Sequence, residues 1–220
     1  MKRGERWIPI ALGLGALVLA AGGWFAWPVA RHIFDPGRQL RPLSIPSQSM
    51  RPTLEPGDRI YPRKLDPSGI KRGEVVVFHL GEELRVARVA AIAGDRIGLR
   101  GGIVSLNGKP IPQISAGRVP GEYGEPARRL LEQFPGEAQP HAILDLSRTP
   151  QDDFDGIEVP PGNLFVLGDN RDNASDSRFP RDHFGVALLP VADVIGRVDF
   201  VAWSTRLPGR FDRPITKVDK

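Results

Sequence analysis

The stretch EVVVFHLGEELRVARVAAIAGD, residues 74–95, decides the fold class of this 220-residue chain. Two valine-rich runs in it flank a short polar Gly-Glu-Glu sequence, a pattern typical of an antiparallel β-hairpin. Similar runs bounded by turn residues recur along the chain, at 59–65, 96–108, 142–146, 163–169 and 194–203. Short strands joined by close turns indicate an antiparallel sheet or barrel rather than alternating strand-helix units, so we expect a mostly β protein.

The turn at Gly-Glu-Glu also suggests a register for the hairpin. With Leu80 opposite Leu84, Val77 faces Ala87, and His79 lies diagonally displaced on the same face of the sheet. A histidine with an ordinary pKa is a competent proton acceptor, and the alternative is a half-exposed strand residue without a chemical role.

Composition limits the classes of function. A hydrophobic content of 40% supports a sizeable core in one main domain. The absence of cysteine excludes disulfides, thiolate zinc sites and cysteine nucleophiles. Lysine and arginine are dispersed, so we predict no binding of nucleic acid. The histidines show no metal-ligand spacing, and we predict neither a metal nor a cofactor.

The N-terminal region has the pattern of a membrane anchor. Residues 7–30 carry no charge, follow a short basic tail at 1–6, and have tryptophans at both ends. We expect a single transmembrane helix with the N-terminus inside. The alternative is a cleaved secretory signal, because the basic tail and the small residues at 20–22 also fit that class.

The rest of the chain divides by composition. A linker at 31–43 precedes a β core formed by 44–110 and 159–204, and 205–220 is a polar tail. Residues 111–158 read as an inserted cap, in which EPARRLLEQF, residues 125–134, is the one credible helical segment.

The stretch SIPSQSMRPTL, residues 44–54, is the candidate nucleophile segment. Two prolines restrict the backbone around its three serines, and a rigid turn can hold a hydroxyl in a fixed, exposed position. Most serines in such loops only cap or solvate the turn, so the segment alone does not establish catalysis.

Four blocks in order resemble the type I signal peptidases. They are SIPSQSMRPTLEPGDRI (44–60), RGEVVVF (72–78), VARVAAIAGDRI (86–97) and GDNRDNASDSR (168–178). The resemblance implies a membrane-bound serine endopeptidase of largely antiparallel sheet. Such an enzyme removes signal peptides from exported pre-proteins, after small residues, at the outer face of the cytoplasmic membrane.

The same resemblance implies roles for individual residues. Ser49 matches the nucleophile, and Ser47 matches the serine whose hydroxyl, with the backbone N–H of Ser49, supports the oxyanion. Positions that line the small apolar substrate pockets are matched by Ile45, Pro46, Met50, Leu54, Ile60 and Val86. The site scaffold is matched by Arg88, Gly168, Asp169, Ala174, Asp176 and Arg178, with Asp176, Arg178 and Arg88 as one charged, hydrogen-bonded set.

The chain departs from the family pattern at the base. The lysine that activates the serine falls at Ala87, and the serine that orients that lysine falls at Ala174. Alanine accepts no proton, and a serine hydroxyl is a poor nucleophile until its proton is removed. The neighbouring arginines are no substitute, because a guanidinium stays protonated.

Three hypotheses follow. The first is a signal peptidase-like endopeptidase with impaired activity. The second is an inactive homologue that binds signal-peptide-like segments or a partner protein, and the third is a specialised peptidase of a secretion or conjugation apparatus. The expected partners are the signal peptides of exported pre-proteins and the lipid bilayer.

Overall fold

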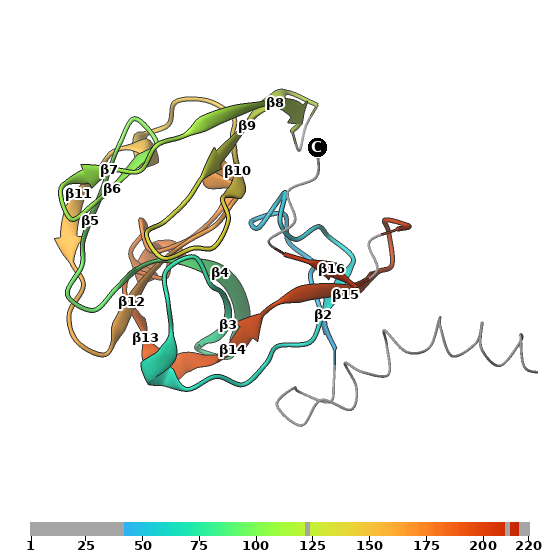
Figure 1. Ribbon diagram of the computed structural model, residues 1–220, viewed down its shortest axis with the longest axis horizontal. Coiled ribbons are helices and arrows are strands. Elements are labelled where there is room, and N and C mark those ends of the chain that lie inside the picture. The colour runs from blue at the N-terminus through green and yellow to red at the C-terminus, as the bar shows by residue number, and fades with distance from the viewer. Residues whose placement is uncertain (1–41, 122–123, 210–211, 216–220) are drawn as a thin grey trace, which may run out of the picture.

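Antiparallel sheets form the fold, as the sequence predicts. The computed structural model describes residues 42–121, 124–209 and 212–215, and every ladder between named strands in these ranges is antiparallel. The strands form four sheets (Figure 1). The helices within these ranges are short 3-10 helices at Pro67–Gly69, Pro150–Asp152, Arg171–Asn173, Arg181–His183 and Val191–Asp193.

The central sheet has five strands in the order β13-β12-β4-β3-β14. Residues Val75 to Phe78 in β3 are all fully buried, because core clusters cover both faces of the sheet. Burial on both faces explains the unbroken valine run. The strands are β3 (Val75–Leu80), β4 (Glu83–Ile92), β12 (Asn163–Leu167), β13 (Leu189–Pro190) and β14 (Val194–Val198).

A second sheet carries the segment that leads into the candidate nucleophile turn. Its order is β1-β2-β15-β16, with β1 (Leu43–Ser44), β2 (Asp58–Ile60), β15 (Phe200–Ser204) and β16 (Arg213–Pro214). The strand expected at 59–65 ends early, at Ile60, and pairing resumes only as an isolated bridge at Arg63. Pro62 lies between the two and has no N–H to donate to a ladder.

Two further sheets lie on the other side of the molecule (Figure 1). One has the order β11-β5-β6-β7, with β5 (Arg96–Arg100), β6 (Ile103–Leu106), β7 (Lys109–Pro110) and β11 (Phe154–Glu158). The other has the order β10-β9-β8, with β8 (Ile114–Pro120), β9 (Pro126–Glu132) and β10 (His141–Asp145).

The expectation of a helix at 125–134 is wrong. Most of this segment is strand β9, which lies between β8 and β10. Its helix-forming residues adopt a strand because the segment pairs with a strand on each side and buries Ala127, Leu130 and Glu132. Tertiary pairing overrides the weak local propensity.

The predicted hairpin between β3 and β4 exists, but its expected register is wrong by one residue. Leu80 pairs with Glu83, so Val76 and not Val77 lies opposite Ala87. The loop is the two residues Gly81 and Glu82, and Gly81 has a φ of 62°, which favours glycine. A slip of one residue transfers every side chain to the other face of the sheet.

Most of the N-terminal prediction lies outside the described residues. These are the tail at 1–6, the proposed span at 7–30 and the linker at 31–43 up to residue 41. Within the described ranges, we find no helix that is both long enough and apolar enough to cross a bilayer.

Replacing Phe165 by alanine tests the core that joins the central sheet to the β5 sheet. Phe165 is 1% exposed, and its ring centroid lies 5.3 Å from that of Phe154. We expect Phe165→Ala to lower the free energy of unfolding by about 3–5 kcal/mol in denaturant titration. Phe184→Ala is the matched control, because Phe184 is 79% exposed and a change of less than about 0.5 kcal/mol is expected. Equal losses in both variants would contradict this account of the core.

Candidate active site

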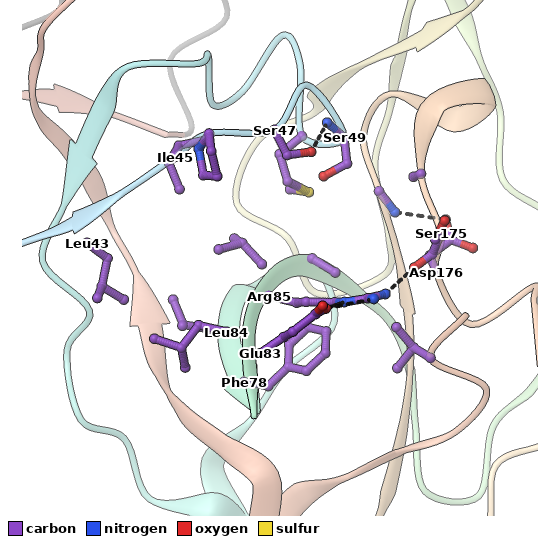
Figure 2. A pocket seen from close by; sticks show the side chains of 18 of the residues that line it. Leu43, Ile45, Ser47, Ser49, Phe78, Glu83, Leu84, Arg85, Ser175 and Asp176 are labelled. Atoms are coloured by element: carbon purple, nitrogen blue, oxygen red, sulfur yellow. Dashed lines mark hydrogen bonds and ion pairs between the residues drawn. The ribbon is translucent and has the colours of Figure 1, made fainter. Parts of the chain in front are cut away.

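A cavity of about 460 Å³ opens between the nucleophile segment, the β3-β4 hairpin and the loop after β12. Its walls come from 43–50, from 77–78, from 83–87 and from 168–186. Figure 2 shows Ser47 and Ser49 on one side of the cavity, with Glu83 and Arg85 facing them from the hairpin. The fold therefore brings together residues of all four sequence blocks.

The two serines of the segment contact each other directly. The backbone N–H of Ser49 donates to the hydroxyl oxygen of Ser47 at 3.1 Å. This bond joins the two groups that the resemblance assigns to the oxyanion. A substrate oxygen that took both donors would have to replace this contact, which a rotation of the exposed Ser47 hydroxyl permits.

Asn170 fixes the turn that carries Ser49. Its backbone N–H donates to the carbonyl oxygen of Ser49 at 3.0 Å, and its side-chain Nδ2 donates to the carbonyl oxygen of Gln48 at 3.1 Å. Asn170 is 3% exposed, so both bonds are protected from water. The position of Ser49 is therefore set by the loop after β12 as well as by its own turn.

Close contact at Gly168 adds to this constraint. A Cβ atom built on Gly168 would lie 2.3 Å from the Cβ of Ala174 and 2.8 Å from the carbonyl oxygen of Ser49. No side chain fits between these atoms. Glycine is required here for the approach of two backbone segments.

Ala87 and Ala174 both line the cavity, together with Ser49. Among the described residues in its wall, the titratable side chains are Glu83, Arg85 and Asp176. The part of the wall that these residues form therefore includes neither lysine nor histidine. Asp176 is 2% exposed and already accepts hydrogen bonds from Arg178 and Gly168.

His79 does not join the site. The observed register pairs it with Leu84, on the face opposite that of Ala87, and it is not among the residues that line the cavity. The expected placement of His79 on the face of Ala87 is therefore wrong. The geometry gives no support to His79 as a substitute base.

One edge of β4 is open where it borders the cavity. β3 pairs with β4 from Glu83 to Arg88, but on the other edge β12 reaches only as far as Arg88. Within the described ranges, no strand covers this edge over 83–87. The backbone groups of Val89 bond toward the β3 side, so by alternation those of Val86 and Leu84 point to the open side.

The apolar part of the cavity belongs to the core behind it. Ile45, Met50 and Val77 are buried in one cluster, and Val86 packs against that cluster. Pro46 also lines the cavity. Leu54 and Ile60 are fully buried within the cluster and do not line the cavity, unlike the other positions matched to substrate pockets.

The expected charged set of Asp176, Arg178 and Arg88 forms only in part, because Asp176 contacts Arg178 but Arg88 pairs elsewhere. Arg88 instead pairs with Asp169, through Nε to Oδ1 at 2.8 Å and Nη2 to Oδ2 at 2.6 Å. Asp176 pairs with Arg178, two residues away, at 2.9 Å. The reason is geometric, because the register places Arg88 opposite Leu167, two residues before Asp169.

The pair between Arg88 and Asp169 is buried and fully charged. Burial raises the pKa of Asp169, but the charge and hydrogen bonds of Arg88 outweigh it, and the net pKa lies below its ordinary value. The hydroxyl of Thr53 also donates to Asp169, which ties the segment after Ser49 to the same carboxylate.

A second buried ionic group lies behind this pair. His141, 3% exposed, contacts Glu137 through Nδ1 at 3.0 Å and Glu132 through Nε2 at 3.2 Å. Arg171 forms an ion pair with Glu132 and donates to the carbonyl oxygen of Gly168 at 3.2 Å. The cap strands β9 and β10 are thereby joined to the loop that holds Ser49.

Sequence reasoning missed the residues of this support. His141, which lies in β10, was not a candidate, and neither was Asn170 or Glu132. No signal was available for Glu132, because the helix expected at 125–134 could place its carboxylate on a solvent-exposed face. Nothing in the sequence pointed to the contact between Asn170 and Ser49, since 121 positions separate them.

We expect Gly168→Ala to displace the Ser49 turn, because the added methyl group would overlap two fixed neighbours. Overpacking of this kind costs about 1–3 kcal/mol in the free energy of unfolding. Gly69→Ala is the control, since a Cβ at Gly69 meets nothing within 4 Å. Thermal unfolding measures both, and an unchanged midpoint for Gly168→Ala would contradict the close approach.

The ionic contacts of His141 predict a pH dependence of stability. Burial and the charge of Arg88 lower the pKa of His141, but its hydrogen bonds to Glu132 and Glu137 outweigh them, and the net pKa is raised. The stabilisation is therefore complete below the unfolded pKa of about 6.5 and is lost as pH rises through the folded pKa.

Denaturant titrations between pH 5 and 9 measure this effect, with His141→Gln expected to remove the decline. His183→Gln is the control, because the His183 side chain is 74% exposed. A slope that survives His141→Gln would assign the effect to another group.

Comparison with known proteins identifies the family. The model of the family described as signal peptidase, peptidase S26, matches residues 34–203. The signal peptidase I of Bacillus caldolyticus is 32% identical over 171 residues, covering 72% of this chain and 77% of that protein. The signal peptidase I of Pseudomonas aeruginosa is 30% identical over 188 residues, covering 74% of this chain and 64% of that protein.

Two further matches have similar names. The probable signal peptidase I-1 of Synechocystis is 31% identical over 173 residues, covering 72% of this chain and 69% of that protein. A crystal structure of a signal peptidase I from Enterococcus faecalis V583 aligns with a TM-score of 0.33 and 20% identity, over 58% of this chain and 95% of that chain. Since the family match spans the candidate site from Leu43 to Val186, the chain belongs to the signal peptidase family, peptidase S26.

Proposed function

We propose that this chain is a signal peptidase I-type serine endopeptidase that cleaves exported pre-proteins after small residues, with Ser49 as the nucleophile. The observation that carries the proposal is the position of Ser49 in the cavity, facing the open edge of β4. An extended peptide can add to such an edge through its main chain, while pockets beneath it select side chains.

The apolar half of the cavity suits a small side chain. Its walls are the side chains of Ile45, Met50, Val77 and Val86, which are held in place by the core behind them. A rigid, shallow pocket cannot enlarge to admit a bulky residue without loss of core packing. Cleavage after small residues is consistent with pocket walls that the core holds in place.

Ser47 is the proposed side-chain donor to the oxyanion, with the N–H of Ser49 as the second donor. The backbone nitrogen of Ser49 and the hydroxyl oxygen of Ser47 lie 3.1 Å apart. One substrate oxygen can therefore accept from both donors once the hydrogen bond between them breaks. Donors aimed at a developing negative charge are worth about 10² to 10³ in rate each.

Removal of the Ser49 proton is the slow step of the proposed mechanism. We infer that Ala87 and Ala174 occupy the positions of a base and its orienting hydroxyl, because both line the cavity beside Ser49. With no lysine or histidine among the described wall residues, the proton passes to solvent, and turnover is slow. A serine hydrolase that lacks one catalytic group retains about 10³- to 10⁴-fold acceleration over water.

We also propose a membrane-bound location, with residues 7–30 as a single span and the β core on the outer face. The uncharged segment and its basic flank support this arrangement. Among the described residues, none of the cap proposed at 111–158 lines the cavity. Its last strand, β11, pairs with β5 and so joins the cap to the core.

Cleavage of a synthetic pre-protein by the full chain in detergent tests the proposal. We expect slow cleavage by the unmodified protein, none by Ser49→Ala, and about 10²- to 10⁴-fold faster cleavage by Ala87→Lys combined with Ala174→Ser. Ala87→Met combined with Ala174→Ser is the matched control, because methionine occupies similar space without an amine.

Cleavage that persists in Ser49→Ala would contradict the proposed nucleophile. Fast cleavage by the unmodified chain would show that another group replaces the base. Tight binding of the pre-protein without cleavage in every variant would instead favour the inactive, peptide-binding homologue.

A further inference from the structure

The charged side of the cavity contains an arginine whose position is fixed but whose charge is weakly neutralised. Nη1 of Arg85 donates to the carbonyl oxygen of Phe184 at 2.7 Å and to that of Ser175 at 3.5 Å. These neutral acceptors hold the guanidinium across the cavity, as Figure 2 shows for Arg85 and Ser175. They orient the cation without cancelling its charge.

A carboxylate of a ligand can replace Glu83, the acidic partner of Arg85. Glu83 accepts from Nε and Nη2 of Arg85 at 3.1 and 3.0 Å, through a single carboxylate oxygen. The Glu83 side chain is 69% exposed, whereas that of Arg85 is 24% exposed. An ion pair with so exposed a partner contributes little, about 0–1 kcal/mol, so a second carboxylate can take its place.

The remaining acid in the wall does not compete for Arg85. Asp176 accepts hydrogen bonds from Nε and Nη2 of Arg178 at 2.9 Å and from the N–H of Gly168 at 3.0 Å. Those bonds satisfy both of its oxygens. The charge of Arg85 is therefore available to a ligand that displaces Glu83.

The strand geometry brings a ligand side chain to this cation. Along β4, Glu83, Arg85 and Ala87 project from one face, and Leu84 and Val86 project from the other. A peptide that pairs with the open edge alternates in the same way. When one of its side chains faces the apolar half beside Val86, the adjacent side chain in the sequence faces Arg85.

We propose that Arg85 is a specificity-determining residue that binds a carboxylate side chain of the peptide substrate. The selected aspartate or glutamate lies next in sequence to the residue that faces Val86. This inference rests on the proposed function, since it takes the cavity as the peptide site. It names a substrate class, peptides with a small apolar residue beside an acidic one.

The test measures binding without cleavage, using the full chain with Ser49→Ala in detergent and fluorescent alanine-based peptides. Each peptide carries one glutamate, moved along the sequence, and is compared with its glutamine isostere by anisotropy. We expect the glutamate peptide to bind about five- to tenfold more tightly at one position, because a preorganised guanidinium forms strong hydrogen bonds with a carboxylate.

Variants of the two charged residues assign the preference. Arg85→Gln is expected to abolish it, and Glu83→Gln to increase it by removing the competing carboxylate. Arg100→Gln is the control, because it makes the same change in net charge on a side chain that is 66% exposed and lies in β5, outside the cavity. Glu83→Gln leaves the contacts of Arg85 with the backbone intact, so the test does not depend on the folding of Arg85→Gln.

The outcomes separate this inference from the proposed function. Binding of the peptides with equal affinity for glutamate and glutamine at every position would overturn the role of Arg85. That role would also be overturned if Arg100→Gln weakened the preference as much as Arg85→Gln. Failure of all peptides to bind would overturn the proposed function, and the inference with it.

Discussion

The buried pair of Arg88 and Asp169 is the interaction on which the site depends. It joins the middle of β4 to the end of β12, and Asp169 also accepts from Thr53, three residues beyond Met50. Arg88 further donates to the carbonyl oxygen of Gly73 at the start of β3. Removing one partner of such a pair would leave an uncompensated charge in the core, at a cost of about 3–5 kcal/mol.

This constraint also holds the candidate nucleophile segment, which is a loop, in place. Asn170 follows Asp169 directly in the chain. The ion pair that fixes Asp169 therefore also places Asn170 against the carbonyl oxygens of Gln48 and Ser49. Next to Asn170 in the chain, Arg171 forms another buried ion pair, with the cap residue Glu132. These contacts surround Ser49 in the cavity that Ala87 and Ala174 also line.

The two sides of the cavity would offer different contacts to the proposed peptide substrate. The apolar side is set by the core and offers shape, whereas the side with Arg85 and Glu83 offers charge at the open end of β4. Electrostatic selection at a partly exposed position contributes more to discrimination between substrates than to affinity. A chain with slow chemistry would gain most from such discrimination, because each bound substrate stays longer in the site.

Some features follow from the sequence alone, because they depend on local patterns. The valine runs around Gly81 predicted the hairpin, and the blocks around Ser49 and Asp176 predicted the family and the wall of one cavity. Other features depend on pairing between distant segments. The register of β3 and β4, the strand at 126–132 in place of a helix, and the partner of Arg88 were decided only when the sheets assembled. Local propensity is worth tenths of a kcal/mol per residue, whereas burial and strand pairing act over the whole element, and this difference decided which prediction held.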